Sequence, residues 1–247
     1  MNNTTEKIDQ WKPLVFNIRD KNQIEQKILE IAVVIKENYK LFGRVGFLKG
    51  NAGVLAFMYY TNSYFNKNIF NHEIDECFQE IIQEVTLKNN ASNSFCEGLA
   101  GFIWAMNLFN TIGFIDSSSD GSLDEVLAEL QKDVQLHIEK GGNFDYLYGS
   151  SIFLAEELIP FDNSLLIDSL MRKIVETDSG SIKVPFVENS HERQGLVYDY
   201  GIAHGTTGVI GCLSANYERT QNNNIKNLIE RLIAFYFESI LFFYRYL

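Results

Sequence analysis

The chain has 247 residues, of which 46% are hydrophobic and 13% aromatic, and its formal net charge is −11. This apolar content fills a sizeable core and excludes a disordered chain, and the length fits a single domain, which we place at residues 1–247. The acidic balance argues against nucleic-acid binding, because phosphate recognition requires clustered Lys and Arg.

The cysteines and the N-terminal region narrow the class further. Cys77, Cys96 and Cys212 are odd in number and widely spaced, which argues against a disulfide framework and a self-contained zinc site. Residues 1–13 have no apolar h-region, and charged side chains interrupt the apolar run at residues 228–247. We therefore predict a soluble, cytoplasmic protein with no membrane span.

Two kinds of helix alternate along the chain. Apolar residues at intervals of three and four predict amphipathic outer helices over residues 24–42, 74–85, 123–134 and 166–174. In the first of these, the predicted buried stripe is Ile24, Ile28, Ile31, Ile35, Tyr39 and Phe42. Runs that are apolar all round predict buried inner helices over residues 54–60, 99–109, 152–158 and 209–217.

The last part of the chain departs from this alternation. Residues 181–200 contain two apolar runs separated by polar residues, which predicts a hairpin or extended insert. Residues 225–247 predict a fifth outer helix, and the chain supplies no buried partner after it. We therefore expect the domain to be incomplete at its C-terminal end.

A glycine turn precedes each buried run. Three of these turns carry a glycine pair separated by two residues, at Gly50/Gly53, Gly98/Gly101 and Gly205/Gly208. A degenerate copy begins at Gly149 and has Ile152 in place of the second glycine. Glycine supplies unusual backbone angles and room for close approach. A recurrence at about fifty residues is typical of a repeat architecture.

The alternation predicts an all-α fold with two concentric layers, an inner ring of apolar helices and an outer ring of amphipathic ones. Each inner helix would begin at the same rim, where helix N-termini carry partial positive charge and favour an anion or a thiolate. A helical solenoid whose glycines only permit close packing gives the same periodicity. The spacing does not choose between these two arrangements.

Together, the turn motifs resemble those of the lanthionine synthetase C-like family. The resemblance rests on Gly201-Ile-Ala-His-Gly205, Asp145-Tyr-Leu-Tyr-Gly149 and the two upstream glycine pairs, and it covers residues 24–217. It implies an α/α toroid of helical hairpins, here incompletely closed. It also implies a cyclisation in which Cys thiols add to dehydrated Ser or Thr in a ribosomally made precursor peptide, and it admits a dehydratase as a partner.

The resemblance also implies a set of site residues. His204 falls on the family's motif histidine and Asp145 on the aspartate ahead of the Tyr-Gly turn, and both are expected to be catalytic. Gly205, Tyr148 and Gly149 are expected to bind substrate. Histidine suits proton transfer because its ordinary pKa, about 6.5, lies near working pH. The alternatives remain open: His204 as a turn residue bonded to a carbonyl, and Asp145 as a helix N-cap.

The family binds zinc through a Trp-Cys-Tyr-Gly-like motif and a Cys-His-Gly motif, and neither occurs in this sequence. Zinc is therefore an implied cofactor for which this chain offers no ligands, and we expect cyclase activity to be lost or impaired. One alternative is a non-catalytic module that holds a peptide or a partner in an open cavity. Another is a carbohydrate- or terpene-active α/α toroid enzyme, which calls for paired acidic residues at the rim; only Asp145 is an obvious candidate.

Overall fold

We describe a computed structural model of the chain over residues 18–41, 43–87, 92–115, 144–149, 151–155, 163–189 and 194–245, with the single residues 128, 132 and 136. In these regions the helices are α2 (Ile18–Asn38), η1 (Tyr39–Leu41), α3 (Asn51–Phe65), α4 (His72–Leu87), α5 (Leu99–Thr111), α7 (Ile152–Ala155), α8 (Asn163–Met171), α9 (Thr206–Thr220) and α10 (Asn223–Arg245). The strands are β1 (Val175–Glu176), β2 (Ile182–Lys183), β3 (Phe186–Asn189) and β4 (Gln194–Val197). The helix expected over residues 123–134 lies almost entirely outside the described residues.

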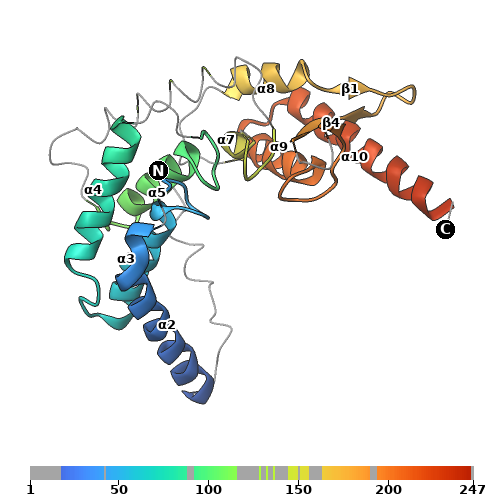
Figure 1. Cartoon of the computed structure of the whole chain (residues 1–247). Helices are drawn as coiled ribbons and strands as arrows, with labels where there is room; N and C mark the ends of the chain where they lie inside the picture. The colour runs from blue at the N-terminus through green and yellow to red at the C-terminus, as the bar shows by residue number, and fades with distance from the viewer. Residues whose placement is uncertain are drawn as a thin grey trace.

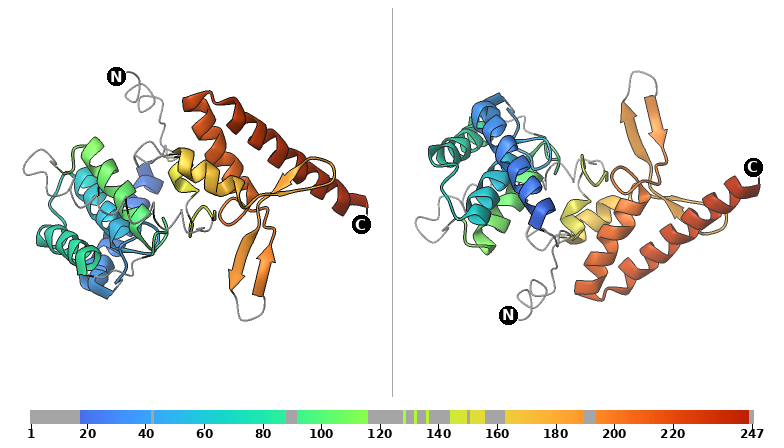
Figure 2. Two further views of the ribbon diagram at one scale, coloured as in Figure 1. Left: turned by 90° about the horizontal axis from the view of Figure 1, so that it is seen from above. Right: turned by 90° about the horizontal axis from the view of Figure 1, so that it is seen from below.

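The helices follow an arc whose two ends, α2 and α10, lie apart in every view (Figures 1 and 2). The inner helices pack as neighbours, α3 against α5 and α7 against α9. Outer helices cover them, since α4 packs on α3 and α10 packs on α9. The predicted all-α fold, an incompletely closed α/α toroid, is confirmed. Among the described helices, none combines the length and the apolar character needed to cross a membrane.

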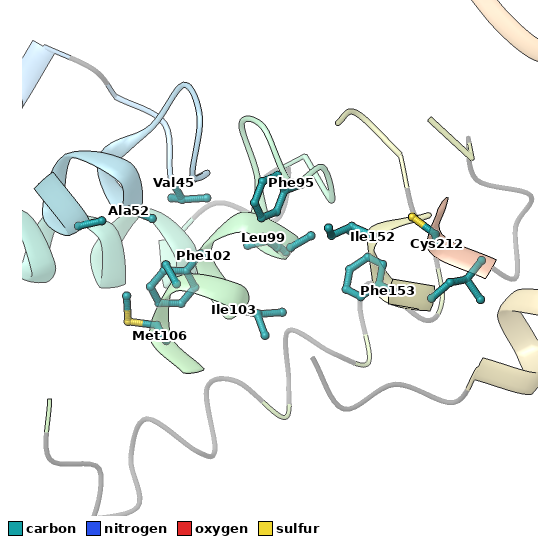
Figure 3. Packing of buried hydrophobic residues seen from close by; sticks show 14 of the residues in the cluster. Val45, Ala52, Phe95, Leu99, Phe102, Ile103, Met106, Ile152, Phe153 and Cys212 are labelled. Carbon is teal, nitrogen blue, oxygen red and sulfur yellow. The ribbon is translucent and has the colours of Figure 1, made fainter. Parts of the chain in front are cut away.

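The inner helix α5 is largely buried, as its sequence predicts, whereas burial on all sides is wrong for α3 and α9, because Tyr60 of α3 is 50% exposed and Gly211 and Ser214 of α9 are exposed. In α5, Phe102, Ile103 and Ala105 have no exposed surface, and Met106 is 1% exposed. The buried residues form one apolar cluster that extends from α3 through α5 to α7 and α9 (Figure 3). Removing this apolar surface from water is the main favourable term in folding, at about 25 cal/mol for each Å² buried. The shared cluster therefore holds successive hairpins together.

The outer helix α2 corrects the predicted buried stripe. Ile24 and Ile31 are 45% and 43% exposed, whereas Ala32 is only 3% exposed. The buried face instead follows Ala32 and Tyr39, with Ile28 and Ile35 partly buried, and the predicted stripe residue Phe42 lies outside the described residues. Apolar residues at steps of three and four predict a buried stripe, but this spacing does not determine the exact residue at each step to within one position. Packing in the core places Ala32, and not Ile31, on the buried face.

The predicted extended insert is present as the antiparallel pair β3–β4, with Phe186 opposite Val197. This hairpin projects from the helical body (Figure 2). A second antiparallel pair, β1–β2, lies just before it and was not predicted at β1. It is anchored on α10, where Arg231 pairs with Glu176 at 2.6 Å and donates to the Gly180 carbonyl at 2.9 Å.

Candidate functional site

Four turns precede the inner helices and share one construction. We call them the rim turns, residues 44–50, 92–98, 144–149 and 199–205. In the first, second and fourth, the N–H of the first helical residue donates to a carbonyl at the start of the turn, at 2.7, 2.8 and 2.8 Å: Asn51 to Arg44, Leu99 to Ser92 and Thr206 to Asp199. Each turn therefore folds back on the helix that it begins.

Glycine is required in these turns for space, not for unusual backbone angles. The first glycines, Gly50, Gly98 and Gly205, have φ of −154°, −131° and −136°, which is ordinary extended backbone. This corrects the expectation of unusual angles. A methyl group on Gly98 would instead meet the Ser92 carbonyl, and one on Gly101 would meet the Phe95 carbonyl, both under 3.0 Å.

Backbone hydrogen bonds join the four rim turns in series. The N–H of Phe47 donates to the carbonyl of Phe95 at 3.1 Å, and this bond joins the first turn to the second. The N–H of Cys96 donates to the carbonyl of Leu147 at 2.9 Å, which joins the second turn to the third. The N–H of Leu147 donates to the carbonyl of Ala203 at 3.3 Å, which joins the third turn to the fourth. Because each bond joins a turn to the next, residues about fifty positions apart are brought side by side.

Asp145 and His204 meet across the third and fourth rim turns. Oδ2 of Asp145 lies 2.7 Å from Nδ1 of His204, and Oδ1 accepts the N–H groups of Leu147 and Tyr148, each at 2.8 Å. Asp145 thus holds its own turn and also contacts the histidine, but it is not the N-cap of a helix, because α7 begins only at Ile152. An ionised carboxylate only accepts hydrogen bonds, so Nδ1 donates and Nε2 is the nitrogen left for proton transfer.

Burial differs sharply between the two partners. The side chain of Asp145 is 10% exposed, whereas that of His204 is 48% exposed. The carboxylate is therefore fixed within the protein, while the imidazole is accessible to a substrate at the rim. Nδ1 of His204 is bonded to this carboxylate and not to a backbone carbonyl, the partner expected for a turn histidine.

Tyr148 and Lys49 extend this pair along the rim. The rings of Tyr148 and His204 are stacked, with centroids 5.6 Å apart and planes at 14°. Nζ of Lys49 donates to the Tyr148 hydroxyl at 2.7 Å and lies 3.7 Å from Oε1 of Glu97. Arg44 also binds Glu97. The hydrogen bond to Tyr148 is the first cause that raises the pKa of Lys49.

These residues occupy the same place in each repeat. Each rim turn ends at a glycine, and the residue directly before that glycine is, in chain order, Lys49, Glu97, Tyr148 and His204. Sequence reasoning selected the last two and missed the first two. The register of the glycine repeat was the signal that identifies them, since equivalent positions in neighbouring repeats line up side by side.

The comparison with known families agrees with this geometry. A family model described as lanthionine synthetase C-like protein matches residues 19–241. The chain belongs to the lanthionine synthetase C-like family. No curated protein matches it. In this lanthionine synthetase C-like protein, the pair expected from the turn motifs, His204 and Asp145, is in direct contact.

The three residues predicted to bind substrate lie at different depths. Tyr148 is 39% exposed beside the imidazole, and Gly149 follows it in the same rim turn, partly exposed. Gly205 is buried at the start of α9, where a methyl group would meet the Asp199 carbonyl under 3.0 Å. Their contact with a substrate stays a prediction.

The zinc implied by the family does not fit the described residues of this lanthionine synthetase C-like protein. Cys77, Cys96 and Cys212 are all buried, and burial raises the pKa of the Cys77 thiol to about 12. Across the described part of the chain, no group of three His, Cys, Asp or Glu side chains is placed to hold a metal ion. We therefore derive no step through zinc.

Proposed function

We propose that the Asp145–His204 pair performs proton transfer in a thioether-forming cyclisation of a dehydrated precursor peptide. The observation that carries this proposal is the 2.7 Å contact between a buried carboxylate and a half-exposed imidazole at the rim. Family membership supports the reaction class. The missing zinc motifs lead us to expect an impaired rate in this chain.

The reaction is an addition of a thiol to a dehydroamino acid. The sulfur forms a bond to the β-carbon, the C=C π pair moves to the α-carbon as an enolate, and the enolate takes up a proton. Nε2 of His204 accepts the thiol proton and later donates a proton to the α-carbon, so no atom is gained or lost overall. Asp145 keeps the second proton on Nδ1 and balances the charge of the imidazolium that forms.

The decisive experiment separates proton transfer from thiolate formation. A synthetic peptide with one dehydroalanine and one cysteine is incubated in water at about pH 8.5, where an ordinary thiol is half ionised without a metal. Because cyclisation does not change the mass, the loss of free thiol is followed by alkylation, and the two α-carbon diastereomers are separated. We expect the protein to enrich one diastereomer.

The His204→Asn variant tests the residue itself. We expect it to lose the diastereomer enrichment and to slow cyclisation by about 10²–10⁴-fold, the usual contribution of a positioned acid–base group. His72→Asn is the matched control, because the His72 side chain is 72% exposed on α4. A diastereomer ratio that is equal with and without the wild-type protein would overturn the proposal.

The second candidate function is non-catalytic peptide binding. It is favoured by the sequence, in which none of the three cysteines is followed by His or set in Trp-Cys. Fluorescence anisotropy with the same peptide, labelled at its N-terminus, separates the two functions. Binding without diastereomer enrichment supports the module, and enrichment supports the cyclase.

A further inference from the structure

Lys49, which was not among the expected site residues, contacts one of them. Lys49 belongs to the first rim turn, yet its ammonium contacts Tyr148 of the third turn, 99 positions away. It occupies the position that Tyr148 and His204 occupy in their own turns, directly before the glycine that ends the turn. The repeat therefore places a cation next to the ring that covers the imidazole.

We propose that Lys49 and Tyr148 are positioning residues for His204. Lys49 fixes the Tyr148 ring through its hydroxyl, and the Tyr148 ring fixes the plane of the imidazole. What the imidazole then does in the reaction rests on the proposed function above. The geometry itself does not depend on the reaction, so the two proposals can fail separately.

The need for a second restraint follows from how His204 is held. Its hydrogen bond to Asp145 engages Nδ1, which leaves the ring free to swing about that contact and to redirect Nε2. The side chain is 48% exposed, so packing around it is incomplete. A ring stacked at 14° on one face removes most of this freedom and directs Nε2.

The position of Lys49 is determined from two sides. Its Nζ lies 2.7 Å from the Tyr148 hydroxyl, 3.7 Å from Glu97 and 5.4 Å from the Tyr148 ring centroid. Glu97 is itself bound by Arg44, and its side chain is only 20% exposed. Exposed ion pairs add little to stability. We therefore expect the loss of Lys49 to change the orientation of the two rings and to leave the unfolding midpoint almost unchanged.

Ring-current shifts of the His204 ring protons measure the stacking directly. In the full chain with ¹³C-labelled histidine, protons above the Tyr148 ring resonate upfield. Tyr148→Leu is expected to abolish this upfield shift. Lys49→Met and Tyr148→Phe are expected to reduce it equally, and the double variant no further, because both remove the same Nζ–hydroxyl contact.

The matched control is Lys67→Met, which removes an exposed lysine from the turn after α3, outside the rim turns. It is expected to leave the His204 signals unchanged. Unchanged signals in Lys49→Met would overturn the role of Lys49, and unchanged signals in Tyr148→Leu would overturn the stacking. In the cyclisation assay, Lys49→Met is expected to lower kcat by up to about 10²-fold with KM unchanged. An intact NMR result without any cyclisation would reject the proposed function alone.

Discussion

His204 and Asp145 are 59 positions apart in the sequence, yet Nδ1 of one lies 2.7 Å from Oδ2 of the other. The contact exists because the third and fourth rim turns are joined by the hydrogen bond from Leu147 to Ala203. The carboxylate is also held by two N–H groups of its own turn. The pair is therefore fixed by backbone on both sides before any substrate arrives.

Asp145→Asn is expected to change the tautomer of His204 while keeping the turn. The amide oxygen still accepts the N–H groups of Leu147 and Tyr148, but its NH₂ group faces Nδ1, so the ring proton moves to Nε2. ¹⁵N chemical shifts of the imidazole measure this exchange. Cyclisation should slow by up to about 10⁴-fold. A variant with the wild-type tautomer would contradict the orienting role of Asp145.

Gly101→Ala is expected to destabilise the fold by about 1–3 kcal/mol or more, because the new methyl group meets backbone atoms of Phe95 and Phe47 that cannot move aside. Urea unfolding followed by circular dichroism measures the change. The matched control is Gly211→Ala in α9, where nothing lies within 4 Å of the methyl group. That change should stabilise by about 0.5–1 kcal/mol, since alanine favours helix. Equal effects of the two changes would refute a packing role for Gly101.

Glu73 should make the protein sensitive to acid. Burial opposes ionisation of its carboxyl, but hydrogen bonds from Lys36 at 2.9 Å and from the N–H of Asn71 at 3.0 Å outweigh it and lower the pKa of Glu73 below 4.5. Because the pKa of Glu73 is lower in the folded protein than in the unfolded chain, its ionised carboxyl stabilises the folded protein above pH 4.5, and this stabilisation is lost as the pH falls. The free energy of unfolding, measured between about pH 3 and pH 7, should fall less steeply in Glu73→Gln than in the wild type. The exposed control Glu37→Gln should follow the wild-type curve.

Cys77 should make the protein sensitive to alkali. Burial, with a contribution from Glu80, raises the pKa of its thiol from 9.0 to about 12. The unfolded chain releases this proton first, so stability present below pH 9.0 is lost as the pH rises toward 12. The slope of the unfolding free energy above pH 9.0 should be shallower in Cys77→Ala. Rapid alkylation of Cys77 in the folded protein at about pH 8, mapped by mass spectrometry, would contradict this assignment.

Periodicity was sufficient to predict the helical layers but not their exact faces. The run that begins at Leu99 is apolar on every side, so it is stable only where most of its surface is buried, whereas the run that begins at Val209 also contains Ser214, which is exposed. The stripe on α2 was shifted, because Ile31 and Ala32 both continue the helical spacing from Ile28 and only packing in the core decides between them. The hairpin β1–β2 depends on Arg231 of α10, a distant residue that local sequence does not indicate.

The sequence predicted two residues of the candidate site, His204 and Asp145, but not their neighbours Lys49 and Glu97. His204 and Asp145 carried recognisable turn motifs, whereas Lys49 and Glu97 look like ordinary surface charges when each is considered alone. Their role depends on turns being neighbours in space, which the repeat implies but residue type does not. Of the two reasons expected for the glycines, close approach of backbone carbonyls is confirmed, whereas unusual angles are wrong for Gly50, Gly98 and Gly205.

The hydrogen bonds that join the rim turns in series are made by backbone N–H and C=O groups, which every residue other than proline provides. The side chain in front of each glycine is consequently released from the task of holding the hairpins together. Exchanging Lys49 or Glu97 for another residue can give the rim a different charge or shape without breaking the backbone hydrogen bonds between the turns. The backbone therefore holds the turns together, while the four side chains determine the chemistry of the rim.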